Sequence, residues 1–189
     1  MSSGDLEYLM ASLPYLSFED SNEVRSRVSS ILKKYTNPSE VKKNIVAILE
    51  EEAIKFLTPE ASRLFCEIDL NTIHTWKFQR SKNNLLADFS KYMYNLKREL
   101  KQLRISRSKE DRESLSKKQQ LPITPGNPLE EELLLLQLQC EKLESLSLVH
   151  YTDFTALITY KLKLMLLLRW WGFDTEKGFE LFLQTTKKD

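Results

Sequence analysis

The stretch from 154 to 171 constrains the fold of this chain more than any other part of the sequence. It reads Phe-Thr-Ala-Leu-Ile-Thr-Tyr-Lys-Leu-Lys-Leu-Met-Leu-Leu-Leu-Arg-Trp-Trp. Apolar side chains fall on most faces of such a helix, and a helix of this kind needs packing partners on nearly every side. Asp153 is a candidate N-cap, and Gly172 is expected to end the helix in the left-handed conformation. The sequence therefore predicts an all-α fold, a multi-helix bundle with this helix buried at its centre.

The same stretch is close to the minimum length for a membrane span, but its charges argue against one. Lys161, Lys163 and Arg169 would each cost about 2.5–3.5 kcal/mol near the centre of a bilayer. Lys161 and Lys163 also lie about 200° apart around the helix, so they cannot share one sheltered face. We therefore expect a buried helix in water and no direct membrane insertion. The three cations either anchor acidic partners or, as we favour, extend to solvent along their aliphatic stems.

Two other regions are expected to pack onto this helix. Residues 6–18 hold eight large apolar or aromatic side chains, whose burial is worth several kcal/mol, and Pro14 ends any helix near Leu13. Residues 20–70 predict three short helices, with start signals at Asn37-Pro38 and Thr58-Pro59.

The second half of the chain predicts long helices around one break. Apolar residues recur every three or four positions from Leu85 to Leu103, which predicts a helical hairpin arm or one half of a coiled coil. Residues 106–128 are charged and then proline-rich, so we expect an exposed loop or hairpin tip. Asn127-Pro128 then starts another helix. Residues 1–189 are expected to form a single helical domain.

Composition excludes several classes of function. The 28 basic and 27 acidic side chains nearly cancel, so a nucleic-acid partner is not expected. Only 4 glycines are present, and none forms a phosphate-binding loop motif. Cys66 and Cys140 each lie within a helical pattern of apolar residues, so they are expected to be buried free thiols in a reducing compartment. The first residues show no basic and apolar run typical of a secretory signal.

The sequence predicts no enzyme. His74 and His150 are the only histidines, and neither lies near cysteine or carboxylate residues at metal-ligand spacing. We expect no catalytic residue, no cofactor and no metal. The enzyme alternative would need a Cys–His pair that is assembled only in three dimensions.

A polar cluster follows the third short helix. Asp69 and Asn71 lie beside a helix start, and Arg80 comes after Trp76. These residues predict either a buried polar brace or an ordinary cap with exposed charges, and the sequence favours neither.

Both ends of the chain resemble a bacterial family of helical proteins that are encoded among V-type ATPase genes. The resemblance lies in Tyr8-Leu-Met-Ala-Ser-Leu-Pro-Tyr-Leu-Ser-Phe-Glu-Asp20, Tyr160-Lys-Leu-Lys-Leu164, Arg169-Trp170 and Phe173-Asp174-x-Glu176-Lys177-Gly178. Asp69-x-Asn71-x-Ile73 with Arg80 is also similar to a motif of the V-type ATPase central-stalk protein that joins the rotor shaft to the membrane ring, although the spacing differs.

The resemblance implies a reduced relative of this central-stalk protein. Such a protein would be a non-catalytic, cytoplasmic subunit that is peripherally associated with the inner membrane. It would couple the soluble catalytic part to the membrane ring, with the rotor shaft and that ring as partners. The candidate interface or structural residues are Tyr8, Pro14, Asp69, Asn71, Arg80, Arg169, Trp170 and Asp174. The alternative is a free-standing helical adaptor or scaffolding protein, with Leu85–Leu103 as a coiled-coil dimer contact.

Overall fold

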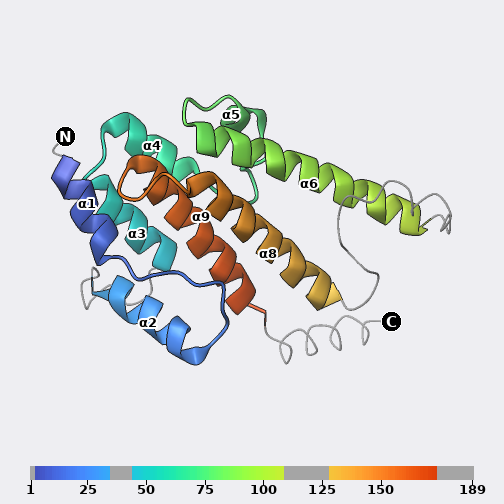
Figure 1. Ribbon diagram of the computed structural model, residues 1–189, viewed down its shortest axis with the longest axis horizontal. Helices are drawn as coiled ribbons and strands as arrows, with labels where there is room; N and C mark the ends of the chain where they lie inside the picture. The colour runs from blue at the N-terminus through green and yellow to red at the C-terminus, as the bar shows by residue number, and fades with distance from the viewer. Residues whose placement is uncertain (1–2, 35–43, 109–127, 174–189) are drawn as a thin grey trace, which may run out of the picture.

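The chain folds into α-helices joined by turns and short extended segments. The computed structural model describes residues 3–34, 44–108 and 128–173, and these residues contain no strand. The all-α prediction is therefore confirmed. The helices are α1 (Ser3–Ser12), α2 (Asn22–Lys33), α3 (Ile45–Ile54), α4 (Pro59–Glu67), α5 (Trp76–Gln79), α6 (Asn84–Ser108), α8 (Pro128–Ser147) and α9 (Phe154–Trp171) (Figure 1).

Helix α9 lies at the centre of the bundle, as its apolar sequence predicts. Ten of its residues are buried, five of them leucines, and α1, α3, α6 and α8 all pack against it. The helix begins where the Asp153 carboxylate accepts a hydrogen bond from the Ala156 N–H at 2.8 Å, as expected of an N-cap. Across the described ranges, no helix has the length and apolar character that a membrane span requires.

The prediction of a left-handed Gly172 is wrong. Gly172 has φ −78° and ψ −8°, in the right-handed helical region, and its N–H donates to the Leu168 carbonyl at 3.0 Å. The helix therefore closes by a normal last-turn bond. A Cβ at this position would lie 3.3 Å from that carbonyl oxygen, a tighter contact than most side chains make.

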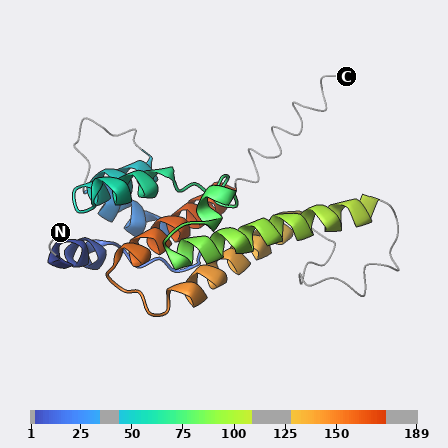
Figure 2. The same cartoon turned by 90° about the horizontal axis from the view of Figure 1, so that it is seen from above.

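Helices α6 and α8 form a long antiparallel hairpin along one side of α9 (Figure 2). The apolar stripe predicted on α6 is buried against α8 and α9 of the same chain. It includes Leu85, Phe89, Met93, Leu96 and Leu103. Helix α8 begins at Pro128, as its start signal predicts. Residues 109–127 of the expected loop lie outside the described residues.

The first third of the chain covers the opposite side of α9. The three short helices predicted between 20 and 70 are α2, α3 and α4, and Thr58 caps α4 by accepting the Ala61 N–H at 3.3 Å. The Asn37-Pro38 start signal lies outside the described residues, and α3 instead begins at Ile45, where the Asn44 side chain caps it by accepting the Val46 N–H at 3.1 Å. Helix α1 ends at Ser12, before Pro14, and Leu9 and Leu16 are buried in the core. The prediction that residues 6–18 pack onto the core is therefore confirmed.

Candidate protein-binding site

The N-terminal segment after α1 runs along α9, so residues 14–19 contact the last helix of the described chain. The Tyr160 hydroxyl donates to the Pro14 carbonyl at 3.0 Å. Further along, the rings of Phe18 and Trp170 lie 4.4 Å apart, and the Trp171 indole N–H donates to the Glu19 carbonyl at 3.0 Å. These contacts join residues about 150 positions apart in the sequence, and they fix an extended segment beside a rigid helix.

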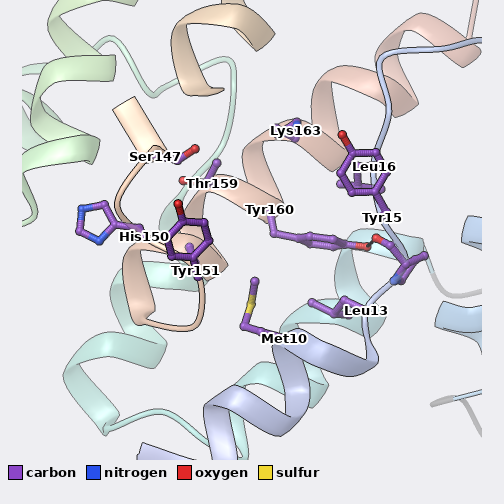
Figure 3. A pocket seen from close by; sticks show the side chains of 12 residues that line it. Met10, Leu13, Tyr15, Leu16, Ser147, His150, Tyr151, Thr159, Tyr160 and Lys163 are labelled. Atoms are coloured by element: carbon purple, nitrogen blue, oxygen red, sulfur yellow. Dashed lines mark hydrogen bonds between the residues drawn. The ribbon is translucent and has the colours of Figure 1, made fainter. Parts of the chain in front are cut away.

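A pocket of about 340 Å³ opens where this segment meets the connection between α8 and α9. The Tyr160 ring extends across it toward Tyr15 and the N-terminal segment, with Met10 and Leu13 on one side and Tyr151 on another (Figure 3). The complete lining is Met10, Leu13, Pro14, Tyr15, Leu16, Ser147, His150, Tyr151, Ala156, Thr159, Tyr160 and Lys163. Most of these side chains are apolar or aromatic, as is usual for a recognition pocket.

The surface around this pocket exposes large apolar side chains. Tyr15 and Tyr151 line the pocket and are 76 % and 77 % exposed, while Leu148 and Val149, next to the lining residues Ser147 and His150, are 70 % and 79 % exposed. Such residues cluster at protein interfaces, because tyrosine buries a large area at a low cost in conformational entropy. We call Tyr15, Leu148, Val149 and Tyr151 the apolar rim.

The polar groups of the pocket already have partners within the chain. The Lys163 ammonium lies 2.8 Å from a Glu144 carboxylate oxygen, and His150 Nδ1 lies 2.6 Å from an Asp153 carboxylate oxygen. With both groups engaged, the pocket suits an apolar side chain better than an anionic small molecule.

Lys161 follows the pocket residue Tyr160 in the sequence, but its side chain points into the core. Its side chain is 0 % exposed, and its ammonium lies 2.5 Å from the Phe65 carbonyl, 2.6 Å from a Glu50 carboxylate oxygen and 4.8 Å from the centre of the Phe65 ring. Phe65 is in the last turn of α4, where the helix dipole is negative and the Phe65 carbonyl accepts only a long backbone bond, from the Ile68 N–H at 3.4 Å. This contact set ties α9 to α3 and α4.

The expectation that the cations of α9 extend to solvent is therefore wrong for Lys161. The physical reason is that Glu50 and the Phe65 carbonyl, distant in sequence, provide it with buried partners. Arg169 is exposed and pairs with Glu132 of α8 at 2.5 Å, so it does reach solvent. The acidic partners of all three cations lie within this chain.

Three of the candidate residues belong to the region just described. Pro14 is buried and forms a wall of the pocket. Trp170 packs against Phe18 at the far end of the same segment, with the two rings tilted by 31°, and Arg169 joins α9 to α8. Tyr8 lies on α1 and is exposed, but it does not line the pocket. Asp174 lies outside the described residues.

The polar cluster at Asp69, Asn71 and Arg80 is not a buried brace. Asp69 accepts the Asn71 N–H at 2.7 Å in an exposed turn, and the Arg80 guanidinium lies 4.1 Å from the centre of the Trp76 ring. Asn71 and Arg80 are both exposed. Of the two predictions for these residues, the ordinary cap with exposed charges is therefore the one that the structure shows. None of the three residues lines the pocket.

The two thiols differ, contrary to expectation. Cys140 is buried, and desolvation raises its pKa to about 11. Cys66 is exposed, because α4 directs its neighbour Phe65 to the core and turns Cys66 outward. Neither histidine meets a thiol: His74 contacts Lys97, and His150 contacts Asp153. Within residues 3–34, 44–108 and 128–173, no three potential metal ligands form a group.

Sequence reasoning misses most of the apolar rim. Leu148, Val149 and Tyr151 fall in a connection between helices, where helical periodicity carries no information. A usable signal is nevertheless present: three large apolar residues occupy a short turn between two strong helices, where polar residues are usual.

Replacing Tyr160 with phenylalanine tests whether the two chain ends are held together by its hydroxyl. We expect a loss of about 1 kcal/mol in unfolding free energy, because phenylalanine lacks the hydroxyl that donates to the partly buried Pro14 carbonyl. Chemical denaturation measures the loss, and amide exchange at Tyr15 and Leu16 should rise with it. Tyr94→Phe, at an exposed tyrosine of α6, is the control and should change neither.

Comparison of the chain with known protein families, with curated proteins and with solved structures finds no match.

Proposed function

We propose that this chain is a non-catalytic subunit of a bacterial V-type ATPase. It acts by protein contact, coupling the soluble catalytic part of the complex to the membrane ring. Its partners would be the rotor shaft and the ring, and it would lie at the cytoplasmic face of the inner membrane without inserting into it.

One observation carries the proposal. The two segments whose residues resemble the ATPase-associated family, 8–20 and 160–164, pack against each other and line the same pocket. Two segments that carry the resemblance and lie far apart in the sequence thus form part of one surface. The apolar rim makes that surface suitable for binding an apolar side chain of another protein.

Purification of a tagged full-length chain from its bacterial host tests the proposal. We expect V-type ATPase subunits among the co-purifying proteins after mild detergent extraction, identified by mass spectrometry. The double variant Tyr15→Ser/Tyr151→Ser should reduce their recovery about tenfold or more, because exposed aromatic anchors carry much of an interface's binding energy.

The matched control is Ile54→Ser/Trp76→Ser, which removes two exposed apolar side chains outside the pocket lining. It should leave recovery unchanged. Absence of ATPase subunits from the wild-type preparation would contradict the assignment. Equal losses in the two double variants would contradict the role given to the apolar rim.

The alternative of a free-standing coiled-coil dimer makes a different prediction. Its proposed contact, the Leu85–Leu103 stripe, is buried against α8 and α9 of the same chain. We therefore expect the isolated protein to have the mass of one chain in light scattering. A dimer that dissociates on substitution within this stripe would favour the adaptor.

A further inference from the structure

Helix α6 carries a second exposed surface whose chemistry differs from that of the pocket. Residues 91–105 contain five basic side chains and one acidic side chain, a net charge of +4. The whole chain has a net charge of +1, so the remaining residues together carry −3. This part of α6 is thus a local net-positive surface on a chain whose other residues are net acidic.

The outer face of α6 has a regular arrangement. Lys91, Tyr94, Arg98, Lys101 and Ile105 follow one another at spacings of three and four, and all five are exposed. Side chains at these spacings lie on one face of a helix. They point away from the stripe that is buried against α8 and α9. Helix α6 also lies along one edge of the bundle (Figure 1). We call these five residues the basic stripe.

The charges of the basic stripe are mostly unneutralised by the described part of the chain. Lys91 lies 3.3 Å from an Asp88 carboxylate oxygen. Arg98 and Lys101 form no ion pair with any described residue. Two neighbouring cations on a rigid helix, neither of them paired within the described part of the chain, favour a partner that supplies carboxylates.

We propose that the basic stripe binds an acidic amphipathic α-helix of a partner protein. Spacings of three and four form a narrow seam that a second helix can follow at a shallow crossing angle. Glutamates on that helix would meet Lys91, Arg98 and Lys101, while its apolar side chains would cover Tyr94 and Ile105, which are about half exposed.

The same features disfavour a nucleic acid or an anionic membrane as the partner. Specific binding to those polyanions rests on many phosphate contacts, with basic residues spread over a broad face. Of the five cations in residues 91–105, three share a seam with two apolar side chains, and Lys97 is engaged with the Asn71 carbonyl and His74. Arg104 alone extends the charge to the side of the seam, and the rest of the chain is net acidic. This inference concerns a different surface from the pocket and does not depend on membership of a rotary ATPase.

Fluorescence anisotropy with a synthetic peptide tests the inference on the full-length protein. The probe is a stapled helical peptide with glutamate and leucine at the seam positions, and the comparison peptide has the same composition in scrambled order. We expect saturable binding of the amphipathic peptide at about 50 mM salt, weakening as screening increases. Arg98→Glu/Lys101→Glu should weaken it about tenfold or more, since like charges would then face each other.

The control variant Arg27→Glu/Arg63→Glu makes the same change in net charge at two exposed arginines on α2 and α4. It should bind the peptide as the wild type does, and circular dichroism should show that both variants keep their helices. Equal binding of the scrambled peptide, or equal behaviour of the two variants, would overturn the inference. So would preferential binding of a short DNA duplex or of phosphatidylglycerol-containing vesicles through Arg98 and Lys101.

Discussion

Replacing Glu50 with alanine is expected to lower the free energy of unfolding by about 3–5 kcal/mol, a large effect for a side chain at the edge of the core. The reason is its partner. Lys161 is fully buried, and Glu50 provides the carboxylate that balances its charge. Without Glu50, the partners that the ammonium keeps among the described residues are the Phe65 carbonyl and the face of the Phe65 ring. Urea denaturation followed by circular dichroism measures the loss.

Two further variants identify the cause. Adding Lys161→Met to Glu50→Ala should recover part of the stability, because methionine fills the same space without a buried charge. Glu52→Ala, on the same helix, removes a carboxylate that pairs with the exposed Lys55 and should cost about 1 kcal/mol or less. If the Glu50 and Glu52 variants lose equal stability, or if Lys161→Met makes the Glu50 variant worse, the buried ion pair does not have this role.

Replacing Leu162 with alanine is expected to cost about 2–5 kcal/mol of unfolding free energy. Leu162 lies in the middle of α9 and is completely buried, and a cavity there would face several helices that cannot all move to fill it. The urea midpoint should fall with little change in its slope. A loss below about 1 kcal/mol would contradict the central position of α9, since core truncations of this size rarely cost so little.

Leu148→Ala is the matched control for this truncation. Leu148 belongs to the apolar rim and is largely exposed, so its stability cost should stay within about 0.5 kcal/mol. The same variant is expected to weaken partner binding. A leucine that matters for stability and a leucine that matters for contact can therefore be separated within one chain.

Local signals in the sequence are sufficient to place the helices. The apolar run at 154–171 and the cap at Asp153 predict α9, and the proline starts at Pro59 and Pro128 predict the beginnings of α4 and α8. Each signal acts within one or two helical turns, where capping and periodicity determine which residues are helical and where the helix begins. The packing of residues 6–18 also follows, because their apolar area is too large to leave in water.

Predictions that depend on distant partners fail more often. Lys161 is predicted to reach solvent because nothing near it in sequence can neutralise it, while Glu50 lies 111 positions earlier. The apolar pattern that assigns Cys66 to the core in fact positions its neighbour Phe65. Asp69 and Arg80 lie close enough in the sequence to suggest one polar cluster. In the structure, Asp69 instead accepts the Asn71 N–H, and Arg80 lies over the Trp76 ring. Which side chains meet is decided by packing, which periodicity alone does not specify.

Purification of the host's V-type ATPase through a tag on a catalytic subunit is the most direct test of the central claim, that this chain works by contact within that complex. The account predicts that the chain is present in the purified complex in a fixed ratio to the other subunits. It also predicts that the chain is lost when it carries Tyr15→Ser/Tyr151→Ser. An intact, ATP-hydrolysing complex that lacks the wild-type chain would contradict the account.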